Sequence, residues 1–150
     1  VEGLLSMDAK IDSTTKNGEN ALYFACQFGR YEVAKALVAR GSDINMRTKE
    51  GQTCLFAAVR CGHKELCEML IDGGVQLEAI TQRGQTSLSW AAMCQQYDVV
   101  VLLVERGSDL YKQDENGQGP LDHAESTLNA HIVEYLRDAQ RKNPQKEDMN

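Results

Sequence analysis

The chain has 150 residues, of which 42% are apolar and 25% charged, a composition typical of one folded domain rather than a disordered segment. No apolar run approaches the roughly 18 residues that a membrane-spanning helix requires, and the N-terminus has no signal-peptide pattern, so we expect no membrane association. The formal charge of −6 argues against nucleic-acid binding, which requires an excess of lysine and arginine.

An internal repeat of 33 residues dominates the sequence. Four short polar tetrads, each typical of a turn, carry a glycine at this spacing. Several columns of apolar residues keep the same spacing, and so many coincident positions at one period indicate repeated structural units. The columns are Gly18, Gly51, Gly84 and Gly117; Leu22, Leu55, Leu88 and Leu121; Ala25, Ala58, Ala91 and Ala124; Val33, Leu66, Val99 and Ile132; and Leu37, Leu70, Leu103 and Leu136.

The repeat divides the chain into successive parts of a single domain. The chain begins inside a truncated repeat, so we expect a piece of a longer protein. At its other end the helix-terminating glycine is lost and the sequence becomes polar, which predicts a capping helix that ends near Pro144. The expected parts are 4–16 (partial upstream repeat), 17–49, 50–82 and 83–115 (full repeats), 116–143 (capping repeat) and 144–150 (polar tail).

Each full repeat predicts two short helices, as the repeat at 50–82 illustrates. After the glycine turn, residues 53–61 form a short apolar segment that Gly62 ends. Residues 64–72 then place apolar side chains on one face of a second helix, which Gly74 ends. Helices this short are marginal alone, but stacked copies bury one another's faces. We therefore expect an all-α solenoid of helix–turn–helix units joined by β-turn or hairpin loops.

This pattern resembles the ankyrin repeat over about residues 4–141. The segments that carry the resemblance are "EGQTCLFAAVRCGHKELCEMLIDGG" at 50–74, "RGSDIN" at 40–45 and "RGSDL" at 106–110. The Thr-Pro-Leu-His opening of that family survives only in fragments, and its histidine position holds Tyr23, Phe56, Ser89 and Asp122. The resemblance implies a protein-binding module whose concave face is built from the first helices and the turns.

Trp90, the only tryptophan, lies in a column of changing size and polarity with Phe24, Ala57 and His123. Because packed columns keep both properties, we expect this column on an exposed side, which in the ankyrin family is the concave face. Stacked helices about 10 Å apart would place Phe24 and Trp90 roughly 20 Å apart, a groove for about six residues of extended peptide. The expected contact residues are Phe24, Phe28, Arg47, Lys49, Glu50, Gln52, Arg60, Arg83, Gln85, Trp90 and Met93.

Simpler interpretations exist for the same residues. Trp90 could pack on Met93, and Phe24 and Phe28 could cover the junction with the upstream repeat. The basic turn residues could be only solvated. If they are contacts, their charge favours an extended protein segment with apolar anchors and an acidic residue or two, bound by a monomer.

Two groups of residues resemble a metal site and a catalytic triad, but both fit structural roles better. Cys61, His63 and Cys67 lack a fourth zinc ligand, and Cys67 belongs to a buried column, so we expect no metal. Residues Asp122 to Ser126 place acid, histidine and serine on one helix without an oxyanion hole. No phosphate-binding glycine loop is present either, so we expect neither enzymatic activity nor a cofactor.

The five cysteines are an odd number without the spacing of a disulfide framework, which favours a reducing compartment, cytoplasm or nucleus. Cys61 and Cys94 are one repeat apart, about 10 Å and beyond disulfide reach, and would be reactive thiols only if both line the groove. Cys26 and Cys54 occupy small-residue positions and are expected to be packed.

We therefore expect a protein-interaction module that binds its partner through the concave face. One alternative is a small-ligand or nucleotide sensor in which Trp90 stacks a base and Arg60 and Arg83 hold a phosphate. Another is a structural spacer between fused domains. The partner, the pathway and the activity of the parent protein do not follow from the sequence.

Overall fold

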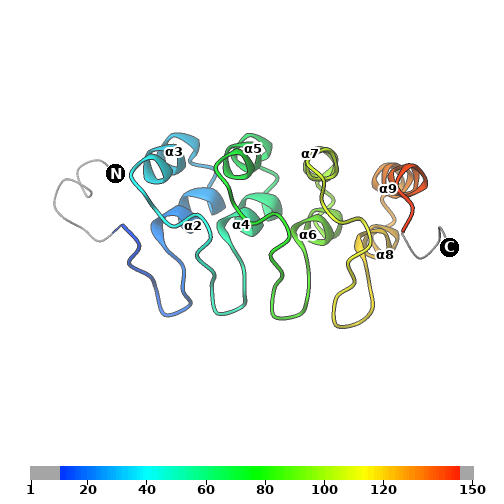
Figure 1. Cartoon of the computed structure of the whole chain (residues 1–150), viewed down its shortest axis with the longest axis horizontal. Helices are drawn as coiled ribbons and strands as arrows, with labels where there is room; N and C mark the ends of the chain where they lie inside the picture. The colour runs from blue at the N-terminus through cyan, green and yellow to red at the C-terminus, as the bar shows by residue number, and fades with distance from the viewer. Residues whose placement is uncertain (1–10, 146–150) are drawn as a thin grey trace. The chain divides into compact units, whose positions relative to one another are not determined.

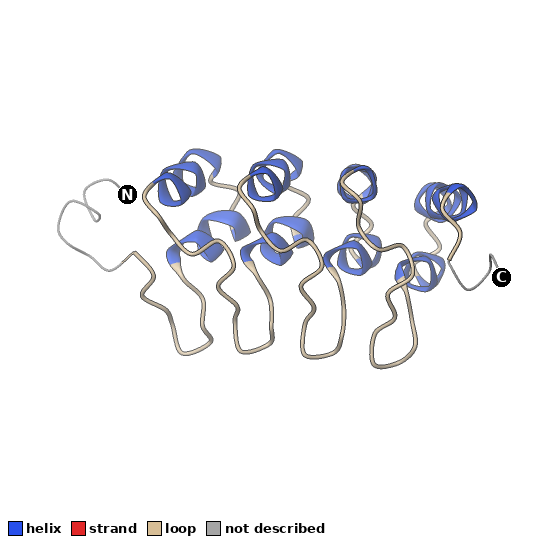
Figure 2. Cartoon of the chain, in the orientation of Figure 1, coloured by secondary structure: helices blue, strands red, loops and turns tan. Residues whose placement is uncertain are grey.

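The computed structural model describes residues 11–145, and within that range all regular secondary structure is helical. The chain divides into two compact units, Val1–Gln76 and Leu77–Asn150. The described helices are coloured in Figure 2, and the expected all-α class is confirmed. Unit 1 contains α2 (Ala21–Gln27), α3 (Tyr31–Ala39), α4 (Cys54–Arg60) and α5 (Lys64–Asp72), and unit 2 contains α6 (Ser87–Met93), α7 (Tyr97–Glu105), α8 (Pro120–Ser126) and α9 (Ala130–Lys142).

In its described residues, each unit contains two helix pairs, in which a seven-residue helix is followed by a longer one (Figure 1). In unit 1, α2 packs against α4 and α3 against α5; in unit 2, α6 packs against α8 and α7 against α9. The short helices of each unit lie next to the long loops, and the longer helices lie on the far side of them. We call the short helices with their loops the loop-side surface of a unit, and the long helices its outer layer.

Local sequence explains where the helices begin and end. The side chain of Asn20 accepts a hydrogen bond from the Tyr23 N–H at 2.9 Å, and Thr86 caps α6 in the same way. The second helix expected at 64–72 is found with those bounds, and the first at 53–61 becomes Cys54–Arg60 between Thr53 and Cys61. Gly62, with φ of +74°, ends α4 as expected by donating its N–H to Val59 O.

The repeat columns form the core of each unit. The alanine column is buried throughout, and so are most members of the other three apolar columns. Leu121 and Val33 are exceptions, since both are only half-buried. Leu121 lies on the last short helix in the described part of the chain, so no later short helix covers it there. The periodic columns therefore predict the core of each unit with two departures.

The loops are hairpins held by one recurring residue position. Thr15, Thr48, Thr81 and Asp114, one period apart, each accept backbone N–H bonds through a side-chain oxygen; in the third, Thr81 Oγ1 accepts from Gln85 at 3.2 Å. Neighbouring loops within a unit are also joined, because the Lys49 N–H donates to Asn17 O and the Glu115 N–H to Arg83 O, both at 2.8 Å. The loops are therefore a continuation of the packed scaffold.

The ends of the chain are described only in part. α9, the helix expected to end near Pro144, ends at Lys142 with Asn143 as its C-cap. Most of the expected partial repeat at 4–16 and of the polar tail at 144–150 lies outside the described residues.

Candidate partner-binding surface

The expected contact residues belong to both units, and each half is therefore described in its own unit. Those in unit 1 are Phe24, Phe28, Arg47, Lys49, Glu50, Gln52 and Arg60. Those in unit 2 are Arg83, Gln85, Trp90 and Met93. All of them come from a short helix, the turn that follows it or a hairpin loop.

In unit 2, Trp90 is half-buried on α6 and is not part of the buried core. Its Nε1–H donates to Gln85 Oε1 at 2.9 Å, which ties the polar edge of the indole to the hairpin loop that precedes α6. The loop is itself held, since the Gln85 N–H donates to Thr81 Oγ1. The indole is therefore a partly exposed ring held in one orientation.

Two other expected contact residues of unit 2 are accessible to different degrees. Met93, one helical turn after Trp90, is half-buried, and Arg83 in the loop that precedes α6 is exposed. The main chain of Arg83 is fixed, because its carbonyl accepts the N–H of Glu115. Tryptophan and arginine are both enriched at protein interfaces.

In unit 1, a small pocket of about 210 Å³ lies between two hairpin loops and the short helices. It is polar, with charged side chains of both signs at its wall. Its lining residues are Asn17, Glu19, Tyr23, Gln27, Thr48, Lys49, Glu50, Gln52 and Arg60.

A hydrogen-bonded chain crosses this pocket. Tyr23 Oη donates to Gln52 Oε1 at 2.9 Å, and Gln52 Nε2 donates to Glu50 Oε2 at 2.9 Å. Burial raises the pKa of Tyr23, although the nearby Arg60 works in the opposite direction. Gln52, one of the expected contact residues, is only 6% exposed, and both ends of its amide are hydrogen-bonded within the chain. Gln52 instead connects α2 to the next hairpin loop.

The two phenylalanines of unit 1 that were expected to contact a partner differ in exposure. Phe24 is half-buried and packs edge-on against Tyr23, with ring centroids 6.2 Å apart. Phe28 is 65% exposed at the end of α2. The exposed loop residues are Arg47, Lys49 and Glu50, and the Arg47 Nε–H donates to Gly51 O at 3.2 Å.

The column that contains Trp90 is not exposed along its whole length. Ala57 is fully buried and His123 is 8% exposed, so the expectation of an exposed column is wrong at both positions. The methyl group of Ala57 is too short to extend beyond the packed surface of α4. His123 is buried because its Nε2 lies 2.9 Å from Asp114 Oδ2, at the base of the neighbouring loop. Variation in size therefore predicts exposure only for the two large aromatic members.

The acid–histidine–serine cluster on α8 has structural partners. The Asp122 carboxylate accepts the Gly119 N–H at 2.8 Å, and Ser126 Oγ donates to Asp122 O. His123 pairs with Asp114, which the sequence pattern did not single out and which sits at the recurring loop position. Burial would raise the pKa of Asp114, but hydrogen bonds from the Gln118 N–H, His123 and the Asn116 N–H outweigh it and lower the pKa.

The cysteines and the helices give no sign of a metal or membrane site. Cys67 is buried and Cys61 exposed, and the described residues contain no group of three or more His, Cys, Asp or Glu side chains that could hold a metal. No helix in the described range is long and apolar enough to cross a membrane. Cys26 and Cys54 are packed as expected.

Comparison with known families supports the repeat pattern. A family model described as "Ankyrin repeats (3 copies)" matches residues 35–114, which is more than half of the chain. A second model, "Ankyrin repeats (many copies)", matches residues 5–55. No curated protein matches the chain.

Proposed function

Because the chain belongs to the ankyrin-repeat family, whose members generally serve as protein–protein interaction modules, we propose that its loop-side surface binds an extended segment or a domain surface of a partner protein. The observation that carries this proposal is Trp90, a large aromatic ring that is half-buried and tied at its polar edge to Gln85. A ring already held in place loses little conformational entropy on binding, so more of its contact area contributes to affinity.

The chemistry of the loop-side surface of each unit supports a partner with apolar anchors and some acidic character. Phe28 in unit 1 and Trp90 in unit 2 supply apolar area. Arg47 and Lys49 in unit 1 and Arg83 in unit 2 are exposed on the loops and can attract carboxylates. Glu50 follows Lys49 in the same loop, so the surface of unit 1 favours a partner of mixed polarity over a polyanion.

The cysteines support a reducing compartment as the place of action. All five thiols are free, and three of them are buried as small packing residues. Cytoplasm and nucleus both meet this condition.

The experiment that tests the proposed surface is capture of partners from cell extract with three forms of the chain. These are the wild type, Trp90→Ala and a matched control, Tyr97→Ala, which removes a 43%-exposed aromatic ring from the outer layer of the same unit. We expect quantitative mass spectrometry to show a partner that Trp90→Ala loses at least fivefold and Tyr97→Ala retains. Equal retention by both variants, with both folded, would contradict a loop-side binding surface.

A further inference from the structure

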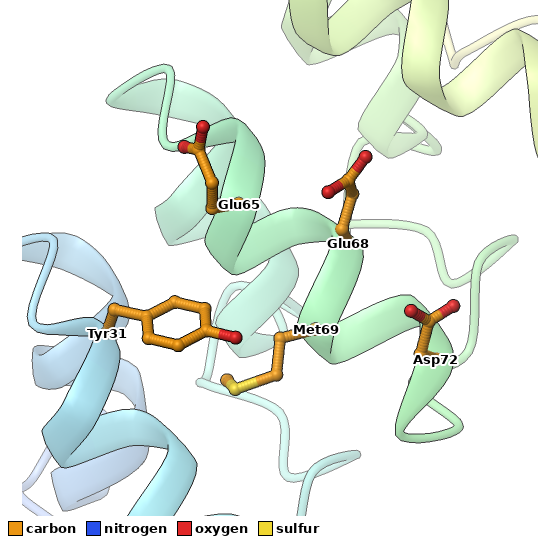
Figure 3. A pocket seen from close by; sticks show the side chains of 5 residues that line it. All are labelled: Tyr31, Glu65, Glu68, Met69 and Asp72. Atoms are coloured by element: carbon orange, nitrogen blue, oxygen red, sulfur yellow. The ribbon is translucent and has the colours of Figure 1, made fainter.

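The outer layer of unit 1 contains an open groove between α3 and α5 (Figure 3). Its volume is about 560 Å³, larger than that of the loop-side pocket. The ring of Tyr31 extends from α3 toward Met69 of α5, and these two side chains form its apolar part. Three carboxylates from α5, those of Glu65, Glu68 and Asp72, complete the lining.

The carboxylates give this groove a strong negative charge. Glu65 and Glu68 form no ion pair within the described part of the chain. Like charges three or four residues apart on a helix are destabilising by a few tenths of a kcal/mol per pair, and Glu65, Glu68 and Asp72 contain two such pairs. The negative end of the α5 dipole, close to Asp72, adds to this potential.

The equivalent position in unit 2 is filled by side chains of the chain itself. Two repeat periods after Tyr31 stands Tyr97, whose ring contacts those of Tyr135 and His131 at centroid distances of 5.9 and 6.5 Å. Tyr135 corresponds to Met69, so unit 2 carries an aromatic ring where unit 1 has a methionine. The open groove is therefore a property of the residues in unit 1, not of the repeat scaffold.

We propose that this outer groove of unit 1 is a second docking surface, which binds an extended, arginine-containing segment of a partner protein. A guanidinium group can stack on the face of Tyr31 and donate bidentate hydrogen bonds to Glu65 or Glu68. A lysine ammonium provides the charge but neither the planar stacking nor the paired donors.

The spacing of the carboxylates indicates the form of the segment. Glu65 and Asp72 are seven residues apart on α5, about 10 Å along the axis at 1.5 Å per residue. In an extended peptide, alternate side chains point to the same side and repeat about every 6.6 Å. Two arginines at alternate positions, about 6.6 Å apart, therefore lie within the length of the acidic wall.

The experiment measures the binding of fluorescein-labelled peptides to the whole 150-residue chain by fluorescence anisotropy. The probe is Gly-Ser-Arg-Gly-Arg-Gly-Arg-Ser, compared with versions that carry lysine or glutamate in place of arginine. We expect the arginine peptide to bind several times more tightly than the lysine peptide, with affinity that falls as salt rises, and the glutamate peptide not to bind. Equal affinity for arginine and lysine peptides would overturn the stacking role of Tyr31.

Variants locate the site and distinguish it from general attraction to an acidic chain. The double substitution Glu65→Gln and Glu68→Gln should weaken binding roughly five- to tenfold. Met69→Tyr, which copies the residue of unit 2, should block the groove and weaken binding to a similar extent. Glu115→Gln removes an exposed carboxylate from a loop of unit 2 and should change affinity less than twofold.

A thermal melt of each variant shows whether the variant is still folded. Removing the like-charge pairs should leave stability unchanged or slightly raised while binding falls. The proposal would be overturned if Glu115→Gln weakened binding as much as the Glu65/Glu68 double variant, or if that double variant bound the peptide as tightly as the wild type. It would also be overturned if self-association of the wild type accounted for the loss of binding. Because Trp90 belongs to unit 2 and does not line this groove, Trp90→Ala should leave this peptide affinity intact, so the two proposals fail independently.

Discussion

Trp90 Nε1 lies 2.9 Å from Gln85 Oε1, and this hydrogen bond connects the indole ring to the hairpin loop immediately before its own helix. The bond satisfies the only polar atom of the ring and leaves part of its apolar surface accessible. The orientation of the tryptophan is thus set by a loop residue, although the two side chains are five positions apart in the sequence.

Gln85→Ala should release the indole edge. We expect a loss of about 1 kcal/mol in the free energy of unfolding, typical of one hydrogen bond, and lower steady-state fluorescence anisotropy of Trp90. Urea denaturation and fluorescence of the native state measure the two effects. The matched control is Gln118→Ala, one repeat later, whose exposed side chain makes no hydrogen bond in the described part of the chain. Equal destabilisation by both substitutions would show that the bond to Trp90 contributes nothing.

Leu128→Gly should stabilise the chain. Leu128 has φ of +58° in the turn between α8 and α9, at the position where earlier repeats carry Gly29 and Gly62. A left-handed conformation costs an L-residue about 1–2 kcal/mol, and glycine avoids this cost. Because glycine also has greater conformational entropy in the unfolded chain, we expect the free energy of unfolding to rise by only about 0.5–1 kcal/mol. Leu128 is 88% exposed, and little burial is lost.

Urea denaturation measures this gain, with Ser126→Gly as the control. Ser126 lies within α8, where glycine should cost about 0.5–1 kcal/mol instead. If Leu128→Gly destabilises the chain as much as the control, its side chain has a contact that exposure alone does not reveal.

Asp114→Asn should remove a pH-dependent part of the stability. The pKa of Asp114 is lowered in the native state, so its contribution is present above the ordinary value near 3.8 and is lost as pH falls through the lower native value. We expect the variant to be about 1–3 kcal/mol less stable than wild type at pH 7, because the carboxylate holds both the loop and His123.

The difference between wild type and Asp114→Asn should shrink between pH 5 and pH 2 in a series of denaturant titrations. Glu115→Gln, at an exposed glutamate, controls for the general effect of removing one negative charge. A gap that stays constant through this acidic range would contradict the role assigned to the Asp114 carboxylate.

The thiols should react in an order set by burial. Burial raises the pKa of Cys67 to about 12, and the neighbouring Cys54 thiol together with burial raises the pKa of Cys26. Because the thiolate is the reactive form, we expect iodoacetamide at pH 8 to label exposed Cys61 first and half-buried Cys94 next. Mass spectrometry of the peptides should find Cys26, Cys54 and Cys67 protected until denaturant is added. Labelling of Cys67 at the rate of Cys61 in the native chain would contradict this packing.

The helices and the core follow from the sequence because they depend on residue type at fixed spacing. The 33-residue columns predict the bounds of α5 and the burial of Leu55 and Leu88, since each copy repeats one steric requirement. Gln95 and Leu128 show the limit of this reasoning: both take the left-handed turn conformation without the glycine that predicts it.

Bonds between repeats are harder to predict, because different residue types perform the same task. Side-chain oxygens of Asp12, Asn45 and Glu78, one period apart, each accept a backbone N–H from the following repeat, at Asp43, Gln76 and Asp109. The three residues share an oxygen acceptor but neither charge nor length. A search for similar residues at the 33-residue spacing therefore misses this column. Only the structure shows which N–H donates a hydrogen bond to each oxygen.

Only some of the exposed residues of the candidate surface could be predicted from the variation along the Trp90 column. That variation indicates exposure for Phe24 and Trp90, whose rings are too large for a packed position. It fails for Ala57, which is small enough to be covered, and for His123, whose buried partner Asp114 lies in the hairpin loop before α8. Exposure thus depends on size and on partners brought near by the fold, and the second of these is not visible in one column.

The most direct test of the loop-side surface uses Trp90 as its own reporter, since it is the only tryptophan of the chain. Acrylamide quenching of its fluorescence is measured in the free chain and in complex with a captured partner segment that lacks tryptophan. Efficient quenching in the free chain and at least threefold weaker quenching in the saturated complex is the predicted result. An unchanged quenching constant at saturation would show that the partner binds elsewhere.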